Sequence, residues 1–311
     1  MKMESILELI GNTPLVGVHA LSPNPDVKIY AKLEGQNPGG SSKDRIAVKM
    51  VELAERDGLL KPGDTILEPS SGNTGIGLAI VAKLRGYRLR IVLPENVSIE
   101  RRQLLEIFGA EITLSPGEEG SNGAIRLAEK IVADEPSYVM PFQYGNPANP
   151  LAHYEHTGPE ILRDCPEVDV FVAGLGTSGT LMGVGRYLKE QKPGTLIVAV
   201  EPPAGELVQG LRNLDDGFIP PIFQGDVLDR KFIVRPRESI EWTRRLLDDC
   251  AVFAGISSGA AVAGAVKMAA TMERGTIVTL LPDGGWKYLS SGAWTDDLDV
   301  VAERATRINY W

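Results

Sequence analysis

The chain has 311 residues and a formal net charge of −9 at pH 7, with 43% hydrophobic and 23% charged residues. This is an ordinary globular composition, long enough for two domains. The acidic balance argues against nucleic acid and anionic membranes as partners, and the sequence has no apolar run long enough for a membrane span, so we expect neither kind of partner.

The cysteines and histidines show no metal or disulfide pattern. Cys165 and Cys250 are too few for a disulfide framework and lack metal-ligand spacing, and the three histidines form no ligand motif. The first residues carry no apolar signal region. We therefore expect a cytoplasmic protein without a metal.

The first long strand and helix flank a loop with a lysine. Residues 27–33 alternate like a strand with one buried face, and the loop 37–45, NPGGSSKDR, leads into an amphipathic helix that ends near residue 57. Lys43 falls in the first helical turn, where the helix dipole disfavours an ammonium. Such a lysine deprotonates readily, as a Schiff-base lysine must. The alternative is a solvated lysine on a capped helix.

From residue 65 onward, strands and helices alternate in two runs. The first run has predicted strands at 65–68, 89–93, 111–114 and 138–140, with helices ending near 84, 108 and 133. The turn-rich stretch 144–150 is the predicted domain boundary. The second run has predicted helices at 153–163, up to 190, 239–249 and after 255, and strands at 168–173, 195–200, 233–234 and 276–281. Two such runs predict an α/β fold with two parallel-sheet domains.

Three loops share one design, in which an apolar strand, a loop rich in Gly, Ser, Thr and Asn, and an apolar helix follow one another. They are residues 70–75, 174–180 and 255–259. In open α/β sheets, ligands bind beyond the carboxyl ends of the strands, where such loops lie. Backbone N–H groups at the start of each helix favour an anion.

The middle loop, GLGTSGT at 174–180, has two interpretations. It matches GxGxxG, and Glu201 ends the next strand, which together resemble a dinucleotide fingerprint and suggest a nicotinamide-dependent dehydrogenase. However, the hydroxyls of Thr177, Ser178 and Thr180 suit a terminal phosphate better. A dehydrogenase would also leave the similar loops of the first half unexplained.

Five motifs in order along the chain resemble one family. They are GNTPL at 11–15, NPGGSSKDR at 37–45, SSGNTG at 70–75, GLGTSGT at 174–180 and GISSGA at 255–260. Together they resemble the cysteine synthases, which are fold-type II enzymes dependent on pyridoxal phosphate and similar to the tryptophan synthase β subunit. The resemblance covers essentially the whole chain.

The resemblance implies a role for each loop around pyridoxal 5'-phosphate. Lys43 would form the Schiff base with the cofactor. Asn73 would lie beside the phenolic oxygen, and Ser257 would bond the pyridine nitrogen, although a serine there is also a common helix N-cap. The implied phosphate-binding residues are Gly176, Thr177, Ser178, Gly179 and Thr180.

The implied reaction is a β-replacement on an activated serine. Lys43 would remove the Cα proton, the leaving group would depart from Cβ to give an aminoacrylate, and a sulfur nucleophile would add. The implied clamp on the substrate carboxylate comprises Ser70, Ser71, Gly72, Asn73, Thr74 and Gln143. Ser70 stands where many members have threonine, which exchanges one hydroxyl for another.

Arg212 bears on the leaving group. It resembles the arginine of the B-type branch, the O-phosphoserine sulfhydrylases, and a guanidinium suits a phosphate dianion. Segments at 94–96, 101–105, 144–149 and 285–290 also resemble that branch. Its sulfur donor is a thiocarboxylated carrier protein. The alternative is an O-acetylserine enzyme that uses sulfide or thiosulfate.

The resemblance also predicts organisation. We expect a smaller mobile domain at 39–148, a larger cofactor-binding domain from 1–38 and 149–311, and a homodimer. The apolar C-terminus, with Tyr310 and Trp311, is predicted either to cover the cleft or to pack on the dimer partner.

Overall fold

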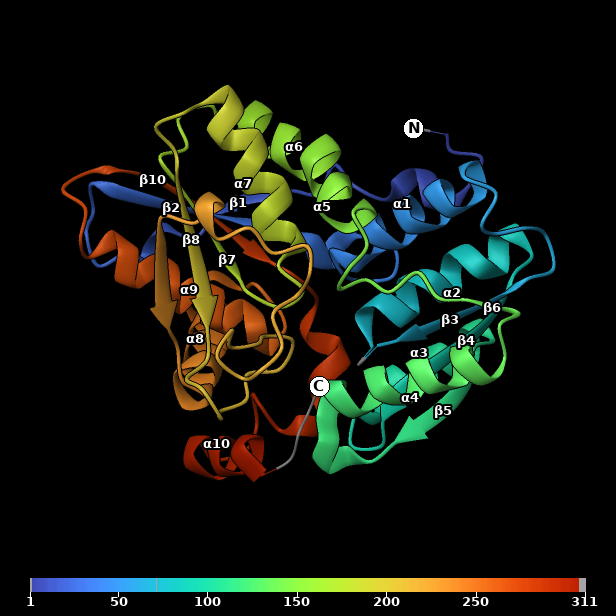
Figure 1. Cartoon of the computed structure of the whole chain (residues 1–311). Coiled ribbons are helices and arrows are strands. Elements are labelled where there is room, and N and C mark those ends of the chain that lie inside the picture. The colour runs from blue at the N-terminus through green and yellow to red at the C-terminus, as the bar shows by residue number, and fades with distance from the viewer. Residues whose placement is uncertain (1, 71, 308–311) are drawn as a thin grey trace.

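Two β-sheets organise the described part of the chain, residues 2–70 and 72–307 of a computed structural model. The larger sheet has the strand order β1-β2-β10-β7-β8-β9, and the smaller has the order β5-β4-β3-β6. Every neighbouring pair is parallel except β1 with β2. Figure 1 shows the sheets in separate lobes. The predicted α/β fold with two parallel sheets is confirmed.

The larger sheet takes strands from both ends of the chain. Its strands are β1 (Leu15–Gly17), β2 (Val27–Leu33), β7 (Val170–Gly174), β8 (Leu196–Glu201), β9 (Arg230–Ile233) and β10 (Gly275–Leu281). The helices around it are α5 (Ala148–Ala152), α6 (Gly158–Asp164), α7 (Gly179–Gln191), α8 (Pro236–Cys250) and α9 (Ile256–Ala269).

Successive residues of the central strand β7 enter different cores. Val170 and Val172 pack in a core with residues of α8 and α9, whereas Phe171 and Ala173 pack with residues of α7. Helices on both faces explain why the strand is a continuous apolar run rather than an alternating one.

The smaller sheet is built from one continuous stretch of chain. Its strands are β3 (Thr65–Pro69), β4 (Arg88–Pro94), β5 (Glu111–Ser115) and β6 (Tyr138–Val139), and its helices are α2 (Asn73–Arg85), α3 (Ile99–Phe108) and α4 (Gly120–Asp134). Helix α1 (Lys43–Arg56) packs on both α2 and α5, so it contacts both lobes.

The sequence missed several elements. It predicted neither the short edge strand β1 nor anything after residue 281, where the structure has a 3₁₀ segment, η7 (Gly285–Ser291), and α10 (Leu298–Arg307). The helix predicted at 153–163 begins earlier, with α5, and passes through a π-helical segment, His153–Thr157, before α6. Part of the predicted boundary at 144–150 is therefore helical.

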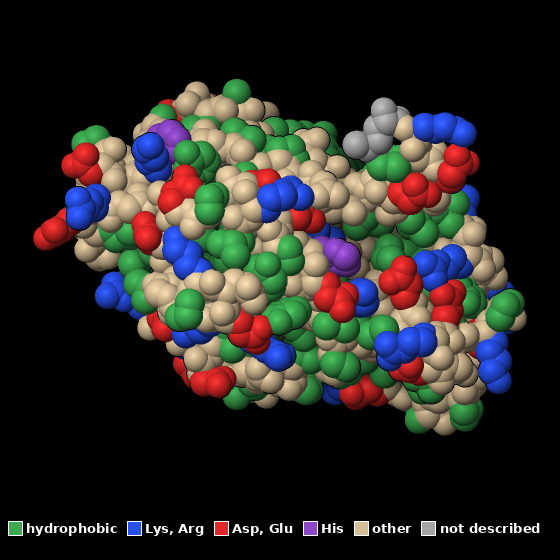
Figure 2. Space-filling view, turned by 90° about the horizontal axis from the view of Figure 1, so that it is seen from above, with side chains coloured by type: hydrophobic (Ala, Val, Ile, Leu, Met, Phe, Trp, Pro, Cys, Tyr) green, Lys and Arg blue, Asp and Glu red, His purple; other side chains and the backbone are tan. Residues whose placement is uncertain are grey.

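The four-stranded sheet lies entirely within the predicted 39–148 unit, although the division into domains and the mobility of the smaller one stay predictions. The proposed roles of Tyr310 and Trp311 fall outside the described residues. No helix in the described ranges is long and apolar enough to cross a membrane. On the face shown in Figure 2, acidic and basic side chains are interspersed, without a large patch of one sign.

Candidate active site

One pocket lies where strand ends of the two sheets meet. Ser70 follows β3, Gly174 ends β7 and Pro282 follows β10, and all three line it. This is where open α/β sheets bind ligands. The sequence-predicted site residues that line it are Lys43, Ser70, Asn73, Thr74, Gln143, Gly176, Thr177, Ser178, Gly179, Thr180, Arg212 and Ser257. Gly72 is not among the lining residues, and Ser71 lies outside the described residues.

Lys43 is the first residue of α1, and the loop before it is tightly held. The Ser42 N–H donates to the Pro282 carbonyl at 2.8 Å, and Lys43 Nζ lies 3.3 Å from Ser42 Oγ. Gly40 has a φ of +76°, and a Cβ there would lie 2.5 Å from the Trp286 ring. Only glycine both adopts this positive φ easily and leaves room for the Trp286 ring. Gly40 therefore allows the loop to place Lys43 at the pocket.

Burial lowers the pKa of Lys43, while the carboxylates of Asp283 and Glu34 act in the opposite direction. The sequence predicted an easily deprotonated lysine from the helix dipole, and the structure adds desolvation as the largest cause. A lysine that loses its proton readily can act as a nucleophile and as a base.

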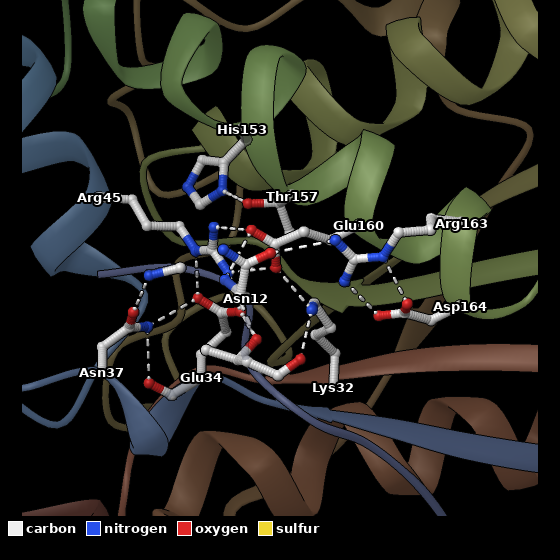
Figure 3. Close-up of polar contacts among 12 residues, drawn as sticks. Asn12, Lys32, Glu34, Asn37, Arg45, His153, Thr157, Glu160, Arg163 and Asp164 are labelled. Carbon is white, nitrogen blue, oxygen red and sulfur yellow. Dashed lines mark hydrogen bonds and ion pairs between the residues drawn. The ribbon is translucent and has the colours of Figure 1, made fainter. Parts of the chain in front are cut away.

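A buried charge network lies under the first turn of α1 (Figure 3) and consists of Lys32, Glu34, Arg45 and Glu160. Arg45 donates to both oxygens of Glu34 at 2.7 and 2.9 Å and to both oxygens of Glu160 at 2.7 and 2.8 Å. Lys32 Nζ lies 2.6 Å from Glu160. Burial opposes the ionisation of Glu160, but the hydrogen bonds and charge of Arg45 outweigh it and lower the pKa of Glu160 to about 2. Two cations thus balance two carboxylates.

The N-terminal GNTPL motif closes this network. The Thr13 hydroxyl donates to Glu34 at 2.6 Å, and the Asn12 N–H donates to Glu160 at 2.9 Å. Because Arg45 is two residues after Lys43, these bonds fix the start of α1 to the larger lobe. The motif therefore has a structural role next to the pocket.

The loop between β7 and α7 makes two close approaches that require glycine. A Cβ would lie 2.6 Å from the Gly210 carbonyl if placed on Gly176, and 1.8 Å from Asn149 Oδ1 if placed on Gly179. Ser178 has a φ of +71°, and its buried Oγ has no hydrogen-bond partner within the described chain. A phosphate at this helix N-terminus would satisfy that hydroxyl.

His153 supports this loop, and the sequence had not singled it out as a site residue. Its Nε2 lies 3.2 Å from Thr180 Oγ1, and its Nδ1 lies 3.0 Å from Thr157 Oγ1. Burial lowers the pKa of His153 to about 3, so the ring is neutral. It thereby fixes the orientation of a pocket hydroxyl. The π-helical turn that carries His153 is the backbone irregularity typical of functional sites.

Ser257 is the second residue of α9 and lines the pocket. Its alternative role as a helix cap is wrong, because Gly255 is the N-cap. The Cα of Gly210 faces Ser257, since a Cβ added there would lie 3.7 Å from its Oγ. Among the described residues, no side chain or backbone group is hydrogen-bonded to the Ser257 hydroxyl, so it is available to a ligand in the pocket.

Asn73 is held at both ends of its amide by side chains that the sequence missed. Its Nδ2 donates to Asp283 at 2.7 Å, and its Oδ1 accepts from Lys287 Nζ at 2.7 Å. The Tyr288 hydroxyl also donates to Asp283. Lys287 is fully buried, and this burial lowers its pKa to about 8. These contacts fix which end of the amide is the donor.

The loop after β3 is ordered by its own side chains. Ser70 Oγ accepts from the N–H groups of Gly72 and Gly75 at 3.2 and 3.0 Å. The Thr74 hydroxyl donates to Gln143 Oε1 at 2.6 Å, which joins this loop to the segment after β6. The predicted carboxylate clamp is thus brought together, except for Ser71, which is not described.

Arg212 also lines the pocket. It is 7% exposed, and its guanidinium lies 4.6 Å from the Phe218 ring centroid and 5.4 Å from that of Tyr144. Its Nη1 donates to Asn122 Oδ1 at 3.2 Å. None of the ion pairs found between described residues includes Arg212. Among the described residues, Arg212 is therefore a buried cation without a carboxylate partner.

The chain belongs to the family of pyridoxal-phosphate-dependent enzymes, whose profile matches residues 6–283. Its curated relatives are cysteine synthases. That of Staphylococcus aureus strain Mu50 is 44% identical over 305 residues, which cover 95% of this chain and 98% of the relative, and that of strain N315 matches equally.

Solved structures agree with this family. O-ureido-L-serine synthase is 40% identical with a TM-score of 0.89, covering 96% of this chain and 97% of that chain. Cysteine synthase (OASS) from Entamoeba histolytica is 36% identical with a TM-score of 0.88, covering 99% and 96%. The protein is therefore a pyridoxal-phosphate enzyme homologous to the cysteine synthases.

The pocket fits this cofactor. The Ser178 hydroxyl, which has no partner among the described residues, and the glycines around it suit a phosphate, and Lys43 lines the same pocket. The family match decides against the dinucleotide interpretation of residues 174–179. Glu201, the acidic residue of that interpretation, is paired with Lys231 at 2.8 Å.

Proposed function

We propose that the protein makes L-cysteine by β-replacement on an activated L-serine, with O-phospho-L-serine as the favoured substrate. The observation that carries the choice of substrate is Arg212, a buried guanidinium in the pocket with no carboxylate partner in the described chain. A phosphate dianion supplies the missing charge and can accept two parallel hydrogen bonds.

The residues of the pocket divide the work of the reaction. Pyridoxal phosphate supplies an electron sink for the carbanion at Cα. Lys43 would bind the cofactor, remove the Cα proton through Nζ and later return it. The serine Cβ–O bond breaks, the leaving group takes the bonding pair, and a Cβ–S bond forms.

Other residues would bind and orient. The loop 176–180 would hold the cofactor phosphate, Asn73 its phenolic oxygen and Ser257 its ring nitrogen. A neutral hydroxyl at that nitrogen favours elimination over a long-lived carbanion, which suits β-replacement. Residues 70–74 and Gln143 would hold the substrate carboxylate.

The sulfur donor and the assembly belong to the same proposal. A thiocarboxylated carrier protein or sulfide would deliver sulfur, and two copies of the chain would form a homodimer. Both rest on the resemblance to the B-type branch. O-acetyl-L-serine is the second candidate substrate, favoured by the similarity to a structure described as an O-acetylserine enzyme.

The test compares two substrates on two proteins. The wild type and Arg212→Gln, both loaded with pyridoxal phosphate, are assayed with sulfide and each activated serine. Loss of a buried charge-assisted contact should lower kcat/KM for O-phospho-L-serine about 100-fold and leave O-acetyl-L-serine within about threefold. A wild type that prefers O-acetyl-L-serine, or equal losses on both substrates, would contradict the choice of O-phospho-L-serine.

A further inference from the structure

Glu68 is a buried acidic side chain that the proposed reaction does not use. It lies near the end of β3, in the interior of the four-stranded sheet, and is fully buried. No ion pair between described residues includes it. Burial raises its pKa to about 8. An acid in this position is costly, so its contacts require an explanation.

Both oxygens of the Glu68 carboxyl group accept backbone hydrogen bonds from one turn. The Phe142 N–H donates to Oε2 at 2.7 Å, and the Gln143 N–H donates to Oε1 at 2.9 Å. Only a side chain with two acceptor oxygens can receive two neighbouring N–H groups in this way. Glu68 therefore acts on the turn after β6 and not on a charged partner.

That turn has a strained backbone. Phe142 has a φ of +57°, a left-handed conformation that is rare for an aromatic residue. Its carbonyl accepts from the N–H groups of Gly145 and Asn146 at 3.0 and 3.1 Å. Such a conformation persists only where the surroundings determine it, and the Glu68 carboxyl group is the side chain that binds the Phe142 N–H.

Gln143, the next residue, connects the two binding loops. Its side chain accepts from the Thr74 hydroxyl at 2.6 Å and donates to the Pro69 carbonyl at 3.2 Å. Its backbone carbonyl accepts from Asn149 Nδ2 at 2.9 Å, and the same amide donates to Thr177 Oγ1 at 2.9 Å. A continuous path thus runs from the loop after β3 to the loop before α7.

We propose that Glu68 is a positioning residue, whose carboxyl group holds the Phe142–Gln143 turn so that Gln143 can join the substrate loop to the cofactor-phosphate loop. Glu68 does not line the pocket and acts only through this turn. The inference rests on the proposed function, because that function gives Thr74 and Gln143 the substrate carboxylate.

The test is Glu68→Gln, which keeps the shape but replaces one acceptor oxygen by a donor. The readout is the dissociation constant for L-serine, which has the amino-acid carboxylate but a poor leaving group, followed by the visible absorbance of the bound cofactor. We expect about tenfold weaker L-serine binding, a similar rise in KM for the activated serine, and kcat within about threefold.

A matched control uses the other sheet. Glu201→Gln makes the same change at a buried carboxylate that ends β8 and pairs with Lys231. It should leave L-serine binding unchanged. A second variant tests the turn itself, since Phe142→Gly relieves the left-handed strain. The double variant Glu68→Gln/Phe142→Gly should bind L-serine at least about threefold more tightly than Glu68→Gln alone, because glycine adopts a positive φ without support from a neighbouring side chain.

The outcomes separate this inference from the proposed function. A Glu68→Gln variant that binds L-serine like the wild type overturns the inference alone. A loaded wild type that binds no amino acid overturns the proposed function and the inference together. If Glu68→Gln fails to fold, the inference is tested instead by amide hydrogen exchange in the wild-type protein. The Phe142 and Gln143 amides should exchange as slowly as those of β3, and rapid exchange overturns the inference.

Discussion

The charge network under α1 and the pocket wall above it differ in how completely their polar atoms are paired. In the network, Arg45 reaches both oxygens of Glu34 and of Glu160, and Lys32 completes the balance. In the pocket wall, neither the buried Ser178 hydroxyl nor the Arg212 charge is matched within the described residues, since the hydroxyl has no hydrogen-bond partner there and the guanidinium has no carboxylate partner there.

The difference separates groups that hold the fold around α1 from groups that are available to a ligand. Paired charges make the base of α1 rigid, because breaking any member would leave a buried ion uncompensated. The Ser178 hydroxyl and the charge of Arg212 are left for a ligand, and burying them without one reduces stability until that ligand binds. Substitutions in the network should therefore affect folding, and substitutions in the wall should affect binding and catalysis.

The largest effect is expected from Lys43→Ala, which changes a residue that lines the pocket. It should lower the rate of β-replacement by a factor on the order of 10⁴, since both the nucleophile and the base are lost. The free energy of unfolding of the cofactor-free protein should not fall, because a partly desolvated ammonium is removed. Steady-state assays and urea unfolding measure the two effects. Activity within about tenfold of the wild type would refute the role of Lys43.

Arg45→Met tests the network. It leaves Glu34 and Glu160 buried, with Lys32 as the remaining cation of the network. We therefore expect the free energy of unfolding to fall by about 3 to 5 kcal/mol. Urea or thermal denaturation of the cofactor-free protein measures this change. The control is Arg56→Met, which breaks an exposed pair with Asp57 and should leave stability nearly unchanged, because solvent screens such a pair. If both variants lost a similar free energy of unfolding, the network would be no more important for stability than an ordinary surface ion pair.

Glu68 should make stability depend on pH in a direction opposite to that of paired carboxylates. Its folded pKa of about 8 is above the ordinary 4.5, so the folded state retains a proton that the unfolded state has lost. The difference in unfolding free energy between wild type and Glu68→Gln should fall as pH rises from 4.5 to 8, by up to about 1.4 kcal/mol per unit. Denaturation at several pH values measures this, and a difference that rises with pH would contradict it.

Ser178→Ala should have the smallest effect. The affinity for pyridoxal phosphate should fall about three- to tenfold, because one neutral hydrogen bond is lost. The cofactor-free protein should be equally or slightly more stable, since the buried hydroxyl had no partner among the described residues. Equilibrium dialysis and thermal unfolding provide the two measurements. Unchanged affinity would show that the hydroxyl does not serve the phosphate.

The sequence predicted the elements and loops whose signal is local. Glycine-rich turns between an apolar strand and an apolar helix located residues 70–75, 174–180 and 255–259, and each contributes residues to the observed pocket. Strand β2 was predicted with its observed limits, because its alternation is regular.

The residues that the sequence missed depend on contacts between distant segments. Lys287 has the appearance of a surface lysine until the fold places it 2.7 Å from Asn73, 214 positions earlier. His153 and Glu68 have no motif, and their partners are backbone groups and hydroxyls that no spacing rule selects. Such residues become visible only when burial is known.

The pairing of β10 with β2 has a consequence for the order of assembly during synthesis. The smaller sheet comes from consecutive chain and can form while later residues are still unmade. In the larger sheet, Gly275 pairs with Val27, so the centre of that sheet cannot form until almost the entire chain has been synthesised. Pro282, which holds the loop of Lys43, follows the same strand. A nascent chain released before this point has a formed smaller lobe and no complete cofactor pocket.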